Sequence, residues 1–130
     1  MLTLEQFKAA RATLQGVIRT TSLIHSPALS KACGNQVYLK PENMQVTGAY
    51  KIRGAYYKIS TLSEEEKARG LITASAGNHA QGLAYAAQAA GVPATIVMPT
   101  TTPLVKVNNT KDYGAKVILH GEVFDESAEL

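Results

Sequence analysis

The 130-residue sequence contains a single cysteine and no long hydrophobic run. With Cys33 alone, an internal disulfide and a cysteine-rich zinc site are excluded. The three histidines show no metal-ligand spacing, so we expect no metal. No apolar run reaches the roughly 18 residues that span a membrane, and the N-terminus lacks the apolar core of a signal peptide. We therefore expect a soluble cytoplasmic protein with no membrane partner.

The excess of positive over negative charge is also small. Charged residues make up 18% of the chain, the net charge is +3, and no cluster of Lys and Arg exceeds two residues. A nucleic-acid-binding protein should be more basic on one face, so we expect no nucleic-acid partner. The motifs GxGxxG, GxxxxGK[ST] and GxSxG are absent. Their absence argues against dinucleotide-binding, P-loop and serine-hydrolase functions.

Apolar segments alternate with helical patterns from residue 71 onward. Short apolar runs predict strands at residues 71–74, 94–98 and 116–119. The helices expected after these strands cover residues 79–90, residues 102–113, opened by Thr102 and Pro103, and residues 122–130. This order predicts the α/β class, a parallel sheet with helices on both faces. Ligands bind such sheets beyond the carboxyl ends of the strands.

The first part of the chain has weaker patterns. Thr3 and Ser63 each begin a capping box, which predicts a helix after each of them. Ser26, followed by proline, predicts the start of another short helix. Residues 37–40 alternate between apolar and polar and predict a strand.

One polar stretch that could carry catalytic chemistry is KPENMQVTGAYKIRGA, residues 40–55. Its Lys51 follows a glycine-containing turn and is expected in the first turn of a helix. There the helix dipole and the nearby Arg53 would disfavour the charged form of the amine, which suits a lysine that forms Schiff bases. The alternative is a solvated surface lysine. Tyr50 is a second candidate because it adjoins Lys51.

A second stretch is SAGNHAQG, residues 75–82, at an expected strand-to-helix turn. Its small residues let a ligand approach the backbone, and the amides at a helix start favour an anion. Asn78 offers both a donor and an acceptor. The alternative is an ordinary helix start with Ser75 or Asn78 as the N-cap and His79 as a packed histidine.

These two stretches resemble the signature motifs of the serine/threonine dehydratase family, which are fold-type II pyridoxal-phosphate enzymes. TGAYKIRGA, residues 47–55, is similar to the lysine motif, and SAGNHAQG is similar to the asparagine motif. Weaker similarity through residues 96–115 extends the resemblance over nearly the whole chain. It implies that residues 1–45 are helices and a strand of the large-domain type. Residues 46–130 would form the small α/β domain, truncated at its C-terminal helix.

The resemblance also implies roles for individual residues. Lys51 would carry pyridoxal 5'-phosphate as a Schiff base and act as the base at the substrate's α-carbon. Asn78 would hydrogen-bond the ring hydroxyl of the cofactor, and Tyr50, where the family usually has Phe, would pack beside the ring. The loop that takes the substrate carboxylate would comprise Ser75, Ala76, Gly77 and His79.

The implied reaction is β-elimination of L-threonine or L-serine to a 2-keto acid and ammonia, in an enzyme that is a homo-oligomer. A serine racemase or serine dehydratase of the same family is one alternative, and a non-catalytic cofactor- or metabolite-binding module is another. Ala49 replaces the family's usual Ser, so any hydroxyl contact from that position is missing. The family's phosphate loop would lie beyond Leu130, so the 130 residues alone are expected to be an inactive N-terminal part.

Overall fold

The computed structural model describes residues 1–130. Its centre is a parallel sheet of β3 (Leu71–Ala74), β4 (Ala94–Met98) and β5 (Lys116–Leu119), in that order. Ile96 of the central strand is paired with Thr73 on one side and Val117 on the other. All three strands occur where the sequence predicts them, because each is a short apolar run between turn-forming residues.

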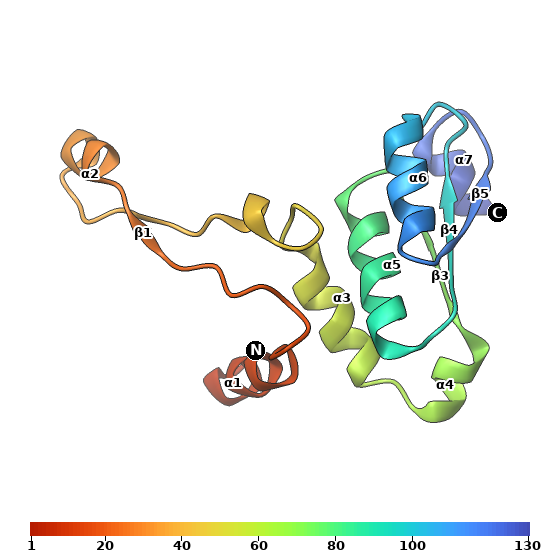
Figure 1. Ribbon diagram of the computed structural model, residues 1–130, viewed down its shortest axis with the longest axis horizontal. Coiled ribbons are helices and arrows are strands. Elements are labelled where there is room, and N and C mark those ends of the chain that lie inside the picture. Colours follow the sequence, from red (N-terminus) through yellow and green to blue (C-terminus); the bar gives the residue numbers. More distant parts are fainter.

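Helices cover both faces of this sheet, as predicted. Helices α5 (Asn78–Ala90) and α6 (Leu104–Asp112) link the strands and contact each other and the sheet. Helix α7 (Phe124–Glu129) contacts β3 and β4 from the opposite face, behind the sheet in Figure 1. Helix α6 begins where Thr102 and Pro103 predict it, with Pro103 in the N-cap position. Thr102 does not cap it, because its buried hydroxyl has no hydrogen-bond partner.

Alanine dominates the core because α5 is packed between the sheet and another helix. The buried face of α5 carries alanines and one glycine, whose small volume lets its neighbours come close. Ile96 and Met98 of β4 are fully buried beneath it. The buried core residues are Ala55, Ile59, Ala80, Ala84, Ala86, Ala87, Val92, Ala94, Ile96, Met98, Val107 and Ala115.

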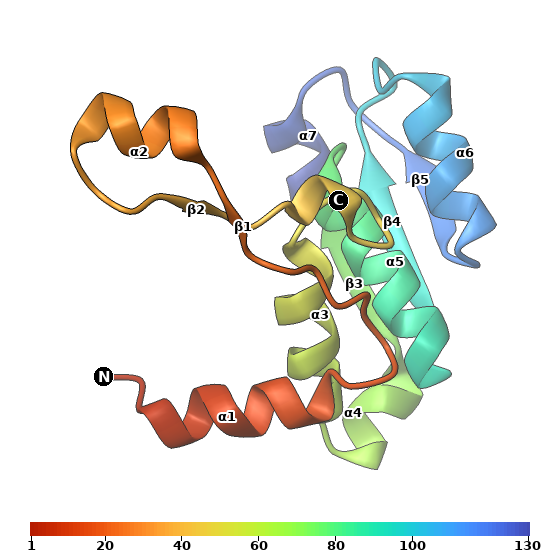
Figure 2. The ribbon, with the colours of Figure 1, turned by 60° about the vertical axis from the view of Figure 1, so that its left-hand side comes forward.

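Helix α3 (Lys51–Ser60) packs along the other side of α5, beside it in both Figure 1 and Figure 2. Its buried residues are Ile52, Ala55 and Ile59, whose spacing places them on one helical face. Helix α4 (Glu64–Arg69) follows, closed at its start by the predicted Ser63 capping box, and leads into β3.

The remaining segments extend away from this α/β unit. Helix α1 (Leu4–Thr13) begins with the predicted capping box at Thr3. Two short antiparallel strands, β1 (Ile24–His25) and β2 (Tyr38–Leu39), flank α2 (Pro27–Cys33) and project with it as an arm (Figure 2). The predicted strand over residues 37–40 shortens to β2, and two-residue β1 is too short to give a sequence pattern.

The arm joins α3 through one turn of 3-10 helix, η1 (Glu42–Met44). Apolar side chains of the arm are exposed, among them Leu23, Ile24 and Tyr38. None of the helices is long and apolar enough to cross a membrane.

We expect substitution of Ile96 by alanine to lower the free energy of unfolding by about 3 kcal/mol, because it opens a cavity in the centre of the sheet. Ile72→Ala is the matched control, since this isoleucine of the neighbouring strand is 71% exposed, and we expect it to cost less than about 1 kcal/mol. Urea unfolding followed by circular dichroism measures both. Equal losses would contradict the burial described above.

Candidate active site

Lys51 is the first residue of α3, as predicted from the turn that precedes it. The turn depends on Gly48, whose φ of 70° lies in the left-handed region that disfavours other residues. The Gly48 amide donates to the Gln45 carbonyl at 2.8 Å and closes the turn. Tyr50 takes the N-cap position without a side-chain hydrogen bond, so the amides of the first turn of α3 have no side-chain cap.

A buried amide side chain ties this loop to the N-terminal segment. Gln45 is 3% exposed. Its Oε1 accepts hydrogen bonds from the backbone amides of Arg19, at 2.8 Å, and Val46, at 3.0 Å, and its Nε2 donates to the Arg19 carbonyl at 2.8 Å. Because all these polar groups are paired, the buried side chain stabilises the loop instead of costing desolvation energy.

An ion pair joins the same loop to α3. Glu42 accepts two hydrogen bonds from the Arg53 guanidinium, at 2.8 and 2.9 Å, and one from the Thr21 hydroxyl at 2.7 Å. The hydrogen bond from Arg53, then that from Thr21, lower the pKa of Glu42 to about 2 against opposing desolvation. Hydrogen bonding to Glu42 also raises the pKa of Arg53. The bidentate pair therefore fixes the direction in which α3 leaves the loop.

This pair corrects one step of the sequence argument. Arg53 was expected to act as a nearby positive charge on Lys51. The structure instead offsets the charge of Arg53 with Glu42, whose side chain is only 16% exposed. With Arg53 paired, the electrostatic features beside Lys51 are the helix start and the adjoining Tyr50 ring.

The second stretch lies where β3 ends at Ala74 and α5 begins at Asn78. Gly77 is the N-cap of α5 and supplies no side chain, so the alternative of a capping Ser75 or Asn78 is wrong. The Ser75 hydroxyl accepts a hydrogen bond from the Gly77 amide at 3.4 Å instead. The first amides of α5 are therefore free of side-chain caps, and a β-carbon at Gly77 would meet no atom within 4 Å.

Packing of α3 on α5 brings the two stretches together. A β-carbon at Gly82 in α5 would lie 3.1 Å from the backbone nitrogen of Ile52 and from the β-carbon of Lys51. Asn78 is one helical turn before Gly82 on the same side of α5. The start of α3 and the start of α5 thus share one edge of the unit, at the carboxyl end of β3.

The side chains at this edge are open to solvent. Lys51, Asn78 and His79 are exposed, and Ser75, Ala76 and Gly77 are half-buried. Exposed His79 is not the packed histidine of the alternative interpretation. Tyr50 is 59% exposed, and the centre of its ring lies 5.4 Å from the Lys51 Nζ. An aromatic face at this distance attracts the ammonium and orients the lysine side chain.

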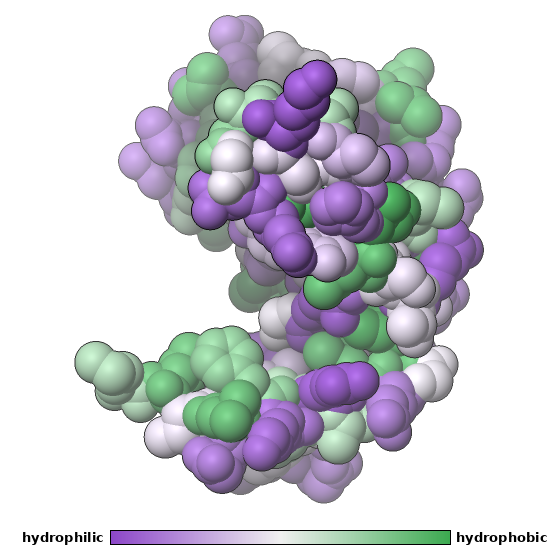
Figure 3. Space-filling model, turned by 90° about the vertical axis from the view of Figure 1, so that its left-hand side faces the viewer, coloured by the Kyte–Doolittle hydropathy of each residue, from purple (hydrophilic) through white to green (hydrophobic).

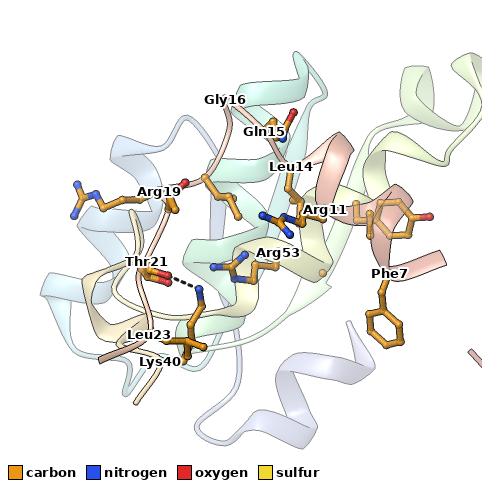
Figure 4. A pocket seen from close by; sticks show the side chains of 15 residues that line it. Phe7, Arg11, Leu14, Gln15, Gly16, Arg19, Thr21, Leu23, Lys40 and Arg53 are labelled. Atoms are coloured by element: carbon orange, nitrogen blue, oxygen red, sulfur yellow. Dashed lines mark hydrogen bonds between the residues drawn. The ribbon is translucent and has the colours of Figure 1, made fainter. Parts of the chain in front are cut away.

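A separate cleft lies elsewhere. It measures about 820 Å³ and is lined by α1, α3 and the segment between α1 and the arm. Figure 3 shows the molecule hollowed between α1 and the arm, and Figure 4 shows the cationic side chains of Arg11, Arg19, Lys40 and Arg53 around the cleft. Lys40 and Arg53 are already hydrogen-bonded within the protein, and neither Lys51 nor Asn78 lines this cleft.

No three His, Cys, Asp or Glu side chains gather as metal ligands.

Sequence reasoning missed three residues that position this site. Gln45 and Glu42 act through contacts distant along the chain, which leave no local signal. Gly82 does leave one, because a glycine inside a helical pattern costs stability and indicates close packing.

Comparison with known proteins decides the family. A family described as "Pyridoxal-phosphate dependent enzyme" matches residues 14–130. The chain belongs to this family. Over 129 residues it is 57% identical to L-threonine ammonia-lyase of Thermotoga maritima, covering 99% of this chain and 32% of the relative. It is 54% identical to the catabolic L-threonine dehydratase TdcB of Staphylococcus aureus, covering 98% of this chain and 37% of the relative.

Solved structures agree with the fold. Serine racemase of Dictyostelium discoideum matches with a TM-score of 0.88 and 35% identity, over 97% of this chain and 41% of the racemase. Threonine deaminase isoform 2 of Solanum lycopersicum matches with a TM-score of 0.82 and 38% identity, over 98% of this chain and 37% of the deaminase. These matches confirm the predicted fold-type II architecture. The chain spans about a third of the length of the curated relatives it matches.

We expect Glu42→Gln to lower the free energy of unfolding at pH 7 by about 2 kcal/mol, because it leaves Arg53 without its charged partner. The folded-state pKa of Glu42 is about 2, below its usual 4.5, so the carboxylate stabilises the fold above pH 4.5 and loses this effect as the pH falls towards 2. The difference between the two proteins should therefore shrink over that range, measured by urea unfolding at several pH values.

The matched control is Glu64→Gln. Glu64 also forms an ion pair, with Lys67 at 2.7 Å, but its side chain is 90% exposed. We expect a loss below about 0.5 kcal/mol for this variant. A difference for Glu42→Gln that stays constant from pH 7 to pH 2 would contradict the assigned role of the carboxylate.

Proposed function

We propose that the complete protein is a threonine ammonia-lyase, which converts L-threonine to a 2-keto acid and ammonia with pyridoxal 5'-phosphate. The observation that carries the proposal is the meeting of a lysine at the start of α3 with the uncapped start of α5. Relatives 51–57% identical to the chain bear the names L-threonine ammonia-lyase and L-threonine dehydratase. They are about three times as long as the aligned region, so the activity belongs to a protein of that length.

The exposed groups at this edge fit the cofactor. When bound, pyridoxal phosphate supplies an aldehyde that condenses with amines and a ring that accepts electrons from the substrate's α-carbon. The Lys51 amine would hold the aldehyde and later take the α-proton. The Asn78 amide would hydrogen-bond the ring hydroxyl, and the exposed face of Tyr50 would lie beside the ring. Open space around Gly77 leaves room for a planar group next to the backbone.

The start of α5 suits the substrate's carboxylate. Its first amides have no side-chain cap, and uncapped amides at a helix start attract anions. Ser75, Ala76, Gly77 and His79 would form this part of the site. The half-buried residues 75–77 would hold the carboxylate together with exposed His79, while Lys51 acts on the neighbouring α-carbon.

The proposal also divides the chain between two domains. Residues 46–130 would form the small α/β domain, and residues 1–45 would belong to the large domain. The exposed apolar side chains of the arm support this division, because a surface of that kind requires a covering partner. The complete enzyme would act as a homo-oligomer.

The first test identifies the reactive lysine. The protein is expressed from its complete reading frame, incubated with pyridoxal phosphate and reduced with borohydride, and its peptides are weighed. We expect a pyridoxyl adduct on Lys51. Lys58 is the matched control, because it is an exposed lysine on the same helix. Lys51→Ala should abolish the adduct and lower kcat at least about a thousandfold, whereas Lys58→Ala should leave both unchanged. Absence of an adduct on Lys51 would refute the assignment.

The second test identifies the substrate and reaction. We expect L-threonine to yield a 2-keto acid and one ammonia per turnover, measured by coupled spectrophotometry. Serine racemases are among the similar structures, with TM-scores of 0.87 and 0.88, so L-serine is incubated in parallel and analysed for D-serine by chiral chromatography. D-serine as the main product would favour a racemase, and cofactor binding without any product would favour a binding module.

A further inference from the structure

Gly82 lies where an added β-carbon would be in tight contact with the start of α3. It is buried in the second turn of α5, facing the first turn of α3. A β-carbon there would lie 3.1 Å from the Ile52 nitrogen, 3.1 Å from the Lys51 β-carbon and 3.2 Å from the Lys51 carbonyl carbon. These distances are shorter than the ordinary van der Waals contacts of a β-carbon. Two of the three atoms are backbone, so the contact is relieved by shifting the start of α3 relative to α5 by a few tenths of an ångström.

Such a movement has a defined consequence for the site. Lys51 belongs to the part of α3 that must move, and Asn78 is one turn before Gly82 on α5. Separating the two helices at this point therefore separates the lysine from the asparagine. The atoms that the added carbon would meet belong to Lys51 and Ile52, so the displacement is expected at this end of α3.

We propose that Gly82 is a positioning residue that sets the spacing between Lys51 and Asn78, and thereby the reactivity of Lys51 towards pyridoxal phosphate. This inference rests on the proposed function of Lys51. Gly82 is buried against the first turn of α3, and it acts through the position of that turn.

The experiment measures the reaction of Lys51 and not turnover. The complete protein and its Gly82→Ala variant are mixed with pyridoxal phosphate and reduced with borohydride at set times. The Lys51 amine condenses with the aldehyde and releases one water, borohydride adds hydride to the carbon, and the nitrogen ends as a secondary amine. Peptide mass spectrometry reports the ratio of adduct on Lys51 to adduct on Lys58. We expect this ratio to fall at least tenfold in Gly82→Ala.

Two control variants distinguish a change in the position of Lys51 from a general loss of folding stability. Gly54→Ala adds the same methyl group within α3 itself, at a glycine that has no atom within 4 Å of the added carbon. Val107→Ala weakens the core in α6, where Val107 is 3% exposed, away from the start of α3. Both should keep the Lys51 to Lys58 ratio of the unsubstituted protein. If Gly82→Ala does not fold, the double variant with Gly54→Ala restores helix stability, since alanine favours helices over glycine.

Each outcome either supports or overturns the inference. A tenfold lower ratio in folded Gly82→Ala, with both controls unchanged, supports it. An unchanged ratio in Gly82→Ala, while the unsubstituted protein reacts at Lys51, overturns the inference and leaves the proposed function intact. A ratio that falls equally in Val107→Ala, or a double variant that still fails to fold, also overturns it. No adduct on Lys51 in the unsubstituted protein overturns both proposals.

Discussion

The close contact between α5 and the first turn of α3 is the constraint on which the candidate site depends. Two helix starts from separate parts of the chain meet there because one of them carries no side chain at Gly82. Close packing of this kind transmits small changes in volume directly to the backbone. The candidate site thus has close helix packing at its base, while Lys51, Asn78 and His79 lie exposed.

Hydrogen bonds also fix the position of Lys51, because they hold the loop that precedes it. The loop before α3 is held by buried Gln45 and by the pair of Glu42 with Arg53. These contacts link residues 19–21 to the loop, so the position of Lys51 depends on the N-terminal segment as well as on the α/β unit. Arg53 serves this support and carries no free charge towards the lysine. Polar contacts therefore orient the loop before α3, and packing sets the distance between this loop and α5.

The placement of the site follows from general features of parallel α/β sheets. Chain direction brings the end of β3 and the start of α5 to one edge, where ligands of such folds bind. The uncapped amides of α5 add a preference for anions, and Lys51 adds an amine. Membership of the pyridoxal-phosphate dependent enzymes agrees with the exposed lysine, since pyridoxal phosphate offers an aldehyde for an amine.

The sequence by itself determined the local structure. Apolar runs bounded by turn residues predicted all three strands of the sheet, and capping boxes at Thr3 and Ser63 predicted two helix starts, because these signals involve neighbouring residues only. The two stretches around Lys51 and Asn78 also carried enough pattern to suggest their chemistry and family. The two-residue strand β1 and the cap of α6 were not predictable from such signals.

Only the tertiary structure decided how these parts act together. The role of Gln45 depends on a contact with Arg19, that of Glu42 on Arg53 and Thr21, and that of Gly82 on the approach of α3. Each contact joins residues far apart along the chain, and no local pattern encodes its distance. The sequence therefore supplied the candidate groups, and the packing of α3 against α5 decided that they share one edge.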